Sequence, residues 1–145
     1  MKISGWAMDP NALAGFLEEA NLARIATLDD DGRPHVVPAW HWWDGHTFWI
    51  GSDGADRKVA HIRRDPACGL EVDSDLRRKR GVFATGTARI IDGADGRREY
   101  VRITAEQVRR YQVGRPPLQT AEQYASKGEP VVIAIRPERM ISWGR

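Results

Sequence analysis

The chain has 145 residues, a length that suits one domain with its own hydrophobic core. Its formal net charge is only +2, and charged residues make up 29% of it, which favours a folded, well-solvated protein and does not demand a nucleic-acid partner. Cys68 is the single cysteine, which excludes an intrachain disulfide and a cysteine-based metal site. Because no apolar run approaches the roughly 18 residues of a membrane span and no signal-peptide pattern opens the chain, we expect one cytoplasmic domain over 1–145 with no membrane partner.

The first third of the chain is predicted to form a helix followed by three strands. Asp9 can cap a helix that has Pro10 in its first turn. Four apolar residues follow at helical spacing: Leu13, Phe16, Leu17 and Ala20. Strands are expected over 22–28, 33–43 and 47–52, separated by short polar turns. Three strands joined in this way form an antiparallel meander.

The rest of the chain alternates short helices with strands. The expected elements are a helix over 57–64, strands over 68–73 and 82–92, a turn over 93–96, a helix over 98–113, a short helix after Thr120 that ends near Lys127, and a last strand over 131–136 that 139–143 extends. Pro66 ends the first of these helices, and residues 120–123 form a capping-box pattern. Six strands with interposed helices predict a mainly β fold, a six-stranded antiparallel barrel, closed or split, with a few peripheral helices.

Residues that suit a phosphate group follow the third predicted strand. Ser52 supplies a hydroxyl, and Arg57 and Lys58 stand at the start of a helix, whose dipole favours an anion. Arginine can hold a phosphate through two hydrogen bonds, and lysine can hold it as a point charge. The alternative is that both cations are simply a solvated helix face.

The second predicted strand carries a further group of candidate residues. By strand parity, Val36, Pro38 and Trp40 share one face, and Val37 and His41 share the other. Pro38 cannot donate to a neighbouring strand, so this strand should lie at an edge or a bulge, where a planar ligand could reach backbone groups. The alternatives are that the tryptophan is core or interface bulk and that His41 is a structural histidine and not an acid or base.

The sequence lacks the usual machinery of hydrolysis and metal catalysis. It has no phosphate-binding loop, no nucleophile elbow, and no metal-ligand spacing among its four histidines. Cys68 is expected to be a small buried hydrophobe. Hydride chemistry remains open, because a cofactor can carry the reaction while the protein binds and orients it.

Several short motifs, taken in order, resemble the pyridoxamine 5′-phosphate oxidase-like, FMN-binding split-barrel superfamily, and within it the enzymes that use the deazaflavin cofactor F420. The segments that carry the resemblance are 26–28, 31–38, 57–59, 62–66, 86–88 and 136–143. The resemblance implies a homodimer with two cofactor sites between the protomers, the strand over 36–40 against the ring system, and a phosphate held near the helix start. The cofactor-binding residues that it implies are Val36, Val37, Pro38, Trp40, Ser52, Arg57 and Lys58.

Two departures from the family's oxidases bear on the cofactor. The oxidases place an arginine and a lysine near the FMN phosphate where this chain has Val36 and His41, and their substrate-reading tail of arginine and histidine has no counterpart in the final residues 143–145. The resemblance therefore favours F420, whose longer anionic tail could be attracted by Arg63, Arg64 or the basic run over 77–80.

The sequence leads to one preferred function and three alternatives. We expect an F420-dependent reductase that transfers hydride to a small unsaturated molecule, with Trp40 as a wall of the substrate pocket and no identified proton donor. The first alternative is an FMN-binding oxidase or flavin reductase. The second is a nucleic-acid-binding barrel using the basic run 77–80, which the low net charge and the acidic clusters at 29–31 and 73–75 oppose. The third is a cofactor carrier without catalysis, or a haem-handling relative.

Overall fold

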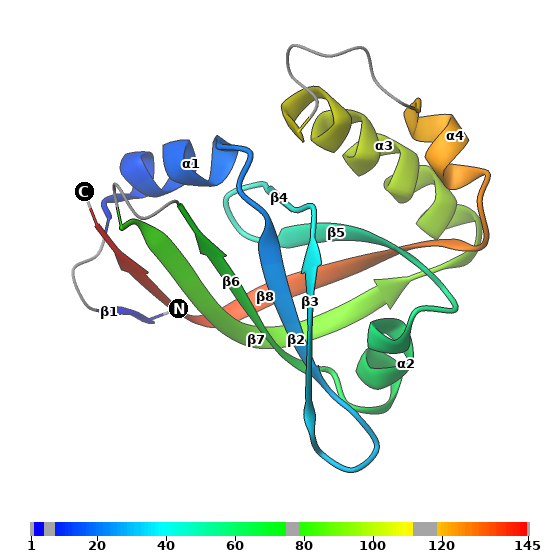
Figure 1. Cartoon of the computed structure of the whole chain (residues 1–145), viewed down its shortest axis with the longest axis horizontal. Coiled ribbons are helices and arrows are strands. Elements are labelled where there is room, and N and C mark those ends of the chain that lie inside the picture. The colour runs from blue at the N-terminus through cyan, green and yellow to red at the C-terminus, as the bar shows by residue number, and fades with distance from the viewer. Residues whose placement is uncertain (1, 5–7, 75–78, 112–118, 145) are drawn as a thin grey trace.

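A curled β-sheet forms the centre of the molecule, and helices pack around it (Figure 1). The structure is a computed structural model that describes residues 2–4, 8–74, 79–111 and 119–144. In chain order its elements are β1 (Lys2–Ser4), α1 (Pro10–Glu18), β2 (Ala23–Leu28), β3 (Pro34–Ala39), β4 (Trp42–Trp43), β5 (Phe48–Asp53), α2 (Arg57–Arg64), β6 (Ala67–Asp73), β7 (Gly81–Ile91), α3 (Gly93–Tyr111), α4 (Ala121–Ala125) and β8 (Pro130–Trp143). The predicted mainly β fold with a few helices is confirmed.

The sheet is a barrel that stays open along one seam. Hydrogen bonds connect seven strands in the order β3-β2-β6-β7-β8-β5-β4, all antiparallel, and β1 pairs in parallel with β8. Within the described residues, the end strands β3 and β4 do not pair with each other. The predicted split barrel is therefore confirmed, although this part of the chain forms eight strands and not six.

The predicted second strand, 33–43, is in fact two strands at opposite ends of the sheet. β3 pairs with β2 and β4 pairs with β5, with Trp40 and His41 between them, so the predicted meander of three strands is wrong. Pro38 has no N–H to donate, and the backbone N–H of His41 donates to the hydroxyl of Tyr111 at 3.3 Å and not to a strand. The expected edge position of Pro38 is confirmed, because β3 ends the strand order.

Helix α3 begins earlier than the sequence predicts, because the expected turn over 93–96 is its first turn. Gly93 has a φ of 64°, a conformation that glycine adopts readily and that lets the chain turn from β7 into the helix. Gly96 lies so close to the carbonyl group of Ile91 that a Cβ atom there would clash. The predicted end of this helix and its stop signal, over 112–117, lie outside the described residues.

Helices α1 and α2 lie at opposite ends of the sheet (Figure 1). α1 begins as predicted, with the Asp9 carboxylate accepting from the N–H of Ala12 at 2.9 Å, but Ala20 lies beyond its end and is exposed. α2 spans the predicted 57–64. One apolar cluster joins both helices to the sheet, and full burial of each large side chain contributes about 1.5–3 kcal/mol. Its large, fully buried members include Phe16, Leu17, Ile25, Phe48, Ile50, Val59, Leu70, Ile133, Ile135 and Met140.

Helices α3 and α4 lie together on one side of the sheet, where α3 packs against β5 and β8 (Figure 1). The predicted capping box of α4 is present. The backbone N–H of Gln123 donates to the Thr120 hydroxyl at 3.2 Å, and the Thr120 N–H donates to the Gln123 side chain at 2.8 Å. This pair of helices covers the part of the seam that holds the candidate site.

Candidate functional site

A cavity of about 360 Å³ lies at the open seam of the barrel. Its walls come from both sides of the seam, from the end of β3 and from β5, and from the helices α2, α3 and α4. The residues that line it are Leu22, Pro38, Ala39, Trp40, Gly51, Lys58, Tyr100, Thr104, Gln107 and Tyr124. The seam therefore places one basic side chain and several aromatic rings around a single space.

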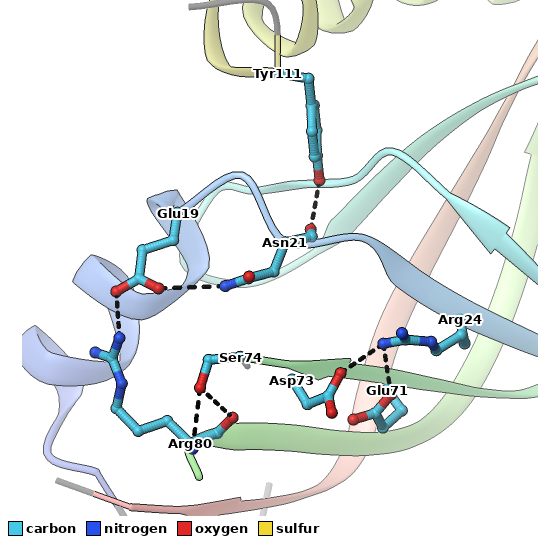
Figure 2. A network of polar contacts seen from close by, with 8 residues as sticks. All are labelled: Glu19, Asn21, Arg24, Glu71, Asp73, Ser74, Arg80 and Tyr111. Atoms are coloured by element: carbon cyan, nitrogen blue, oxygen red, sulfur yellow. Dashed lines mark hydrogen bonds and ion pairs between the residues drawn. The ribbon is translucent and has the colours of Figure 1, made fainter. Parts of the chain in front are cut away.

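One wall of the cavity is an aromatic stack. The ring of Trp40 is nearly parallel to that of Tyr111, with ring centroids 5.1 Å apart and an angle of 6°, and it meets Tyr124 edge-on at 5.9 Å. Tyr111 is itself fixed at its hydroxyl, which accepts from the N–H of His41 and donates to the carbonyl of Asn21 at 2.8 Å (Figure 2). Trp40 is thus held by a ring whose own position is set by the break between β3 and β4.

The opposite wall is formed by α3. Tyr100 lies directly over Gly51, and a Cβ atom at position 51 would come within 2.9 Å of the tyrosine ring. Burial raises the pKa of Tyr100, and a hydrogen bond with Thr104 offsets this only in part, so the phenol keeps its proton at neutral pH. Deeper along the helix, the side-chain amide of Gln107 donates to the backbone carbonyl of Trp49 at 3.3 Å.

Lys58 brings a positive charge to the cavity from the first turn of α2. Its side chain is only 14% exposed, and its ammonium group pairs with the Asp56 carboxylate at 3.1 Å. The hydroxyl of Ser52, which is buried, donates to the same carboxylate oxygen at 2.6 Å. Burial acts to raise the pKa of Asp56, but the hydrogen bonds from Ser52, the Asp53 backbone and Lys58 outweigh it and hold the pKa below its usual value.

The predicted site residues are distributed unevenly around this cavity. Pro38, Trp40 and Lys58 line it, whereas Ser52 lies behind Lys58 and contacts Asp56. Two further predicted residues belong to β3 but do not line the cavity: Val36 is 58% exposed, and Val37 packs against the core. The seventh predicted residue, Arg57, is exposed and does not line the cavity.

The two adjacent cations face different surroundings. Arg57 is exposed, and no acceptor among the described residues pairs with its guanidinium group, whereas Lys58 reaches the cavity. An anion lying at the mouth of the cavity could be approached by both side chains. The predicted clamp of Arg57 and Lys58 on a phosphate therefore stays a prediction.

Three of the cations considered for a longer anionic tail already have partners, whereas Lys79 is exposed and has none among the described residues. Arg63 pairs with Asp92 at 3.0 Å, and Arg64 pairs with Asp30 and donates to the backbone of the β2–β3 turn. Arg80 pairs with Glu19 at 2.6 Å and is 14% exposed (Figure 2). Residues 77 and 78 of the same basic run lie outside the described residues.

Sequence reasoning missed the contribution of α3. Tyr100, Thr104 and Gln107 recur at the i, i+4, i+7 spacing of one helix face, and all three line the cavity. The sequence did contain a signal for them, because polar and aromatic residues stand at a helical spacing that apolar core residues usually occupy. Only the topology shows that this face covers the seam.

Two groups that could have carried acid–base or thiol chemistry are buried and do not line the cavity. His41 is fully buried, and burial, followed by the nearby Arg110 charge, lowers its pKa to about 3. Burial, with a smaller effect from Glu138, raises the pKa of Cys68 to about 12, which keeps its thiol protonated. Within the described ranges, no three His, Cys, Asp or Glu side chains gather closely enough to hold a metal ion. Nor does any helix there combine the length and hydrophobicity that a membrane span requires.

Comparison with known proteins places this architecture in a family. Three similar solved structures are the conserved hypothetical protein Rv2991 from Mycobacterium tuberculosis (24% identity, 99% of this chain and 90% of that one, TM-score 0.80), an F420 reductase (24%, 87% and 93%, 0.71) and HutZ, described as a haem storage protein, from Vibrio cholerae (14%, 88% and 89%, 0.69). At these identities the likeness shows a shared fold. No curated protein sequence matches the chain. The family model for pyridoxamine 5′-phosphate oxidase, however, matches residues 10–144, and the chain therefore belongs to the pyridoxamine 5′-phosphate oxidase family.

Proposed function

We propose that this protein is an F420-dependent oxidoreductase that reduces a small unsaturated or otherwise electrophilic molecule. One observation carries the proposal: the cavity at the seam combines a basic group, Lys58, with the aromatic walls formed by Trp40, Tyr100 and Tyr124. A flat ring system with an anionic tail needs both features in one place. The similarity in fold to an F420 reductase supports the same cofactor.

The residues present suit such a cofactor. Lys58 keeps two ammonium hydrogens beyond the one that it gives to Asp56, and Arg57 has no partner in the described part of the chain, so both can bind an anionic group. The free edge of β3 at Pro38 and the ring of Trp40 can lie against a planar ring system. When bound, the reduced cofactor supplies a hydride.

The protein's own contribution is position, exclusion of water and a proton. The aromatic walls limit the space above the ring system, which restricts the substrate to a small molecule. Tyr100 and Thr104 are protic groups of the α3 wall, and the Tyr100 phenol, whose pKa is raised by burial, is protonated at neutral pH. Tyr100 is therefore our candidate for the group that donates the proton which accompanies hydride transfer.

We further propose that the protein works as a homodimer. The outer face of the sheet exposes apolar side chains: Val36 is 58% exposed and Phe83 is 40% exposed. Sheet register pairs Val36 with Ala26 and Ala26 with Gly69, small residues that allow a flat contact, and the Phe83 ring lies near Gly69. This face adjoins Pro38 at the seam, so a second protomer there would complete the surroundings of the cavity. Analytical ultracentrifugation should give a dimer for the native protein and a monomer for Val36→Lys.

Equilibrium dialysis against F420 and FMN tests the proposed cofactor. We expect F420 to bind, and Lys58→Ala to weaken its binding by about tenfold or more, in line with the loss of a charge-assisted contact. Lys127→Ala, which removes an exposed lysine from the end of α4, is the matched control and should bind as the native protein does. Tight binding of FMN with none of F420 would overturn the choice of cofactor. Unchanged affinity of Lys58→Ala for both cofactors would overturn the site itself.

The second candidate is the same cavity used with FMN, as an oxidase or flavin reductase. The family model supports this alternative, since its description is that of an oxidase, pyridoxamine 5′-phosphate oxidase. The colour of the purified protein distinguishes the two, because a tight FMN site retains yellow cofactor through purification. A host that makes no F420 would yield colourless protein under the first proposal.

A further inference from the structure

The carboxylate of Asp56 is bound like a small anion next to Lys58, the basic residue that lines the cavity. Its Oδ2 atom accepts from the Ser52 hydroxyl at 2.6 Å, from the Asp53 backbone N–H at 3.1 Å and from the Lys58 ammonium at 3.1 Å. Asp56 occupies the N-cap position of α2, yet its side chain caps no amide of that helix. The side chain has turned instead toward the hydroxyl and the ammonium that the sequence assigns to a phosphate.

A count of donors shows that Asp56 and a bound phosphate compete. A serine hydroxyl has one proton to donate, and that of Ser52 is given to Asp56. Ser52 therefore cannot donate to a ligand while this hydrogen bond stays in place. Lys58 can serve both, but the nearby carboxylate offsets part of its positive charge.

The other acidic side chains near Asp56 add to its negative charge. The Asp53 carboxylate accepts from the N–H groups of Ala55 and Glu129, and the Glu129 side chain lies against Gly54. Three carboxylates, those of Asp53, Asp56 and Glu129, thus gather at the loop that leads into α2, the helix that begins with Arg57 and Lys58. A ligand anion that enters here meets an environment with an excess of negative charge.

We propose that Asp56 is a specificity-determining residue, an internal anion that favours a cofactor with a singly charged phosphodiester over one with a doubly charged phosphate monoester. The proposal rests on the proposed function, because it concerns the same cofactor site. The repulsion from Asp56 grows in proportion to the charge on the phosphate group that lies beside it, and a phosphate monoester carries close to two negative charges above pH 7. F420 holds its phosphate as a diester and FMN as a monoester, so Asp56 disfavours FMN more strongly.

The test compares three ligands by their dissociation constants at pH 7.5 in Asp56→Asn and the native protein. Riboflavin has the FMN ring but no phosphate, and it reports effects on the ring site alone. We expect Asp56→Asn to bind FMN about tenfold more tightly, to gain less for F420, and to leave riboflavin unchanged. Asp95→Asn is the matched control, because it changes net charge equally at the exposed pair with Arg98 and should alter none of the three.

A second substitution, Ser52→Ala, distinguishes two effects of Asp56→Asn. One is that the Ser52 hydroxyl becomes free to bind the ligand, and the other is that the negative charge of Asp56 is lost. In the native protein, Ser52→Ala should change FMN affinity little, because its hydroxyl is already held by Asp56. In the Asp56→Asn background, the same substitution should reverse part of the gain for FMN. Such coupling between the two sites is not expected if Asp56 acts only through distant electrostatics.

The outcomes distinguish this inference from the proposed function. If Asp56→Asn gains no FMN affinity, or gains riboflavin affinity equally, the inference is wrong even where F420 binds the native protein as proposed. If neither cofactor binds the native protein, the proposed function fails. Titration with inorganic phosphate then tests the inference alone, and equal phosphate affinity in the two proteins would overturn it.

Discussion

Trp40 and Tyr111 form a parallel stack that joins the broken second strand to the end of α3, with ring centroids 5.1 Å apart. The stack depends on two hydrogen bonds at the Tyr111 hydroxyl, one from the N–H of His41 and one to the carbonyl of Asn21 (Figure 2). Because Trp40 lines the cavity, the stability of this junction and the shape of the site are linked.

Tyr111→Phe should destabilise the protein while keeping the stack. The substitution retains the ring but leaves a backbone N–H and a carbonyl without their partner, a loss of about 1–3 kcal/mol. Urea denaturation should show a lower midpoint, and the tryptophan emission of the folded state should stay close to that of the native protein. An unchanged midpoint would contradict the proposed role of the hydroxyl. Tyr124→Phe, on the other ring that meets Trp40, allows comparison at a site without the His41 contact.

Gly51→Ala should disturb the α3 wall. The new methyl group would come within 2.9 Å of the Tyr100 ring, so the ring must shift into the cavity. We expect F420 affinity to fall by about tenfold, since displacing a packed side chain commonly changes an interaction by 1–3 kcal/mol. Tyr100→Leu in the same protein should restore part of the affinity by removing the clash.

Gly15→Ala is the matched substitution outside the site. A Cβ atom at this position in α1 would meet no atom within 4 Å. Because alanine favours a helix over glycine, the protein should gain about 0.5–1 kcal/mol in its free energy of unfolding. The cofactor affinity should not change, and a loss of affinity in Gly15→Ala would show that the fall expected for Gly51→Ala is not specific to the α3 wall.

The stability of the protein should fall as the pH drops below 6.5. His41 has a pKa near 3 in the folded protein against an ordinary value of 6.5, so the unfolded chain binds a proton that the folded protein refuses. Between these values, the free energy of unfolding should decrease by up to about 1.4 kcal/mol per pH unit. The lowered pKa of Asp44 and of Asp56 has its effect only at lower pH, because their ordinary value is 3.8.

His41→Phe should remove this dependence between pH 6.5 and 5, as measured by urea midpoints. Phenylalanine keeps an aromatic ring beside Phe48, which meets His41 edge-on at 6.1 Å, and it does not titrate. Substitution of the exposed His46 by asparagine should leave the slope in place. A His41→Phe protein with an unchanged slope would show that another group causes the loss of stability.

Thr27→Val should weaken the attachment of α2 to β2. The Thr27 hydroxyl lies 2.9 Å from Nδ1 of His61, and both residues are buried. Valine keeps the shape but leaves the imidazole nitrogen without its partner, which lowers the free energy of unfolding by about 1–3 kcal/mol. Thr27→Ser keeps the hydroxyl and should lose less. Equal losses for the two variants would assign the effect to packing and not to the hydrogen bond.

Much of the local structure could be predicted because the signals are local. The Asp9 cap and the capping box at Thr120 follow from side chains that bond to backbone groups three residues away. The end of α2 follows from Pro66, which disfavours helical geometry at Asp65. The edge position of Pro38 follows from its missing N–H in the same way. The barrel with a few helices follows from the number and spacing of these elements.

The failures concern contacts between distant parts of the chain. The strand predicted over 33–43 breaks because Tyr111, seventy residues later in the sequence, binds the N–H of His41. The α3 residues of the site, such as Tyr100, became visible only when the fold placed their helix over the seam. No periodic pattern in the sequence contains that information.

For this protein, the sequence by itself determined the family, the starts of α1, α2 and α4, and the presence of a basic pair at Arg57 and Lys58 after a strand. The tertiary structure alone decided that Lys58 lines the cavity while Arg57 does not, and that Ser52 is bound to Asp56. The physical reason is that capping and strand edges depend on neighbours along the chain. A cavity, and the partner that each donor finds, depend on which distant surfaces the closed fold brings together.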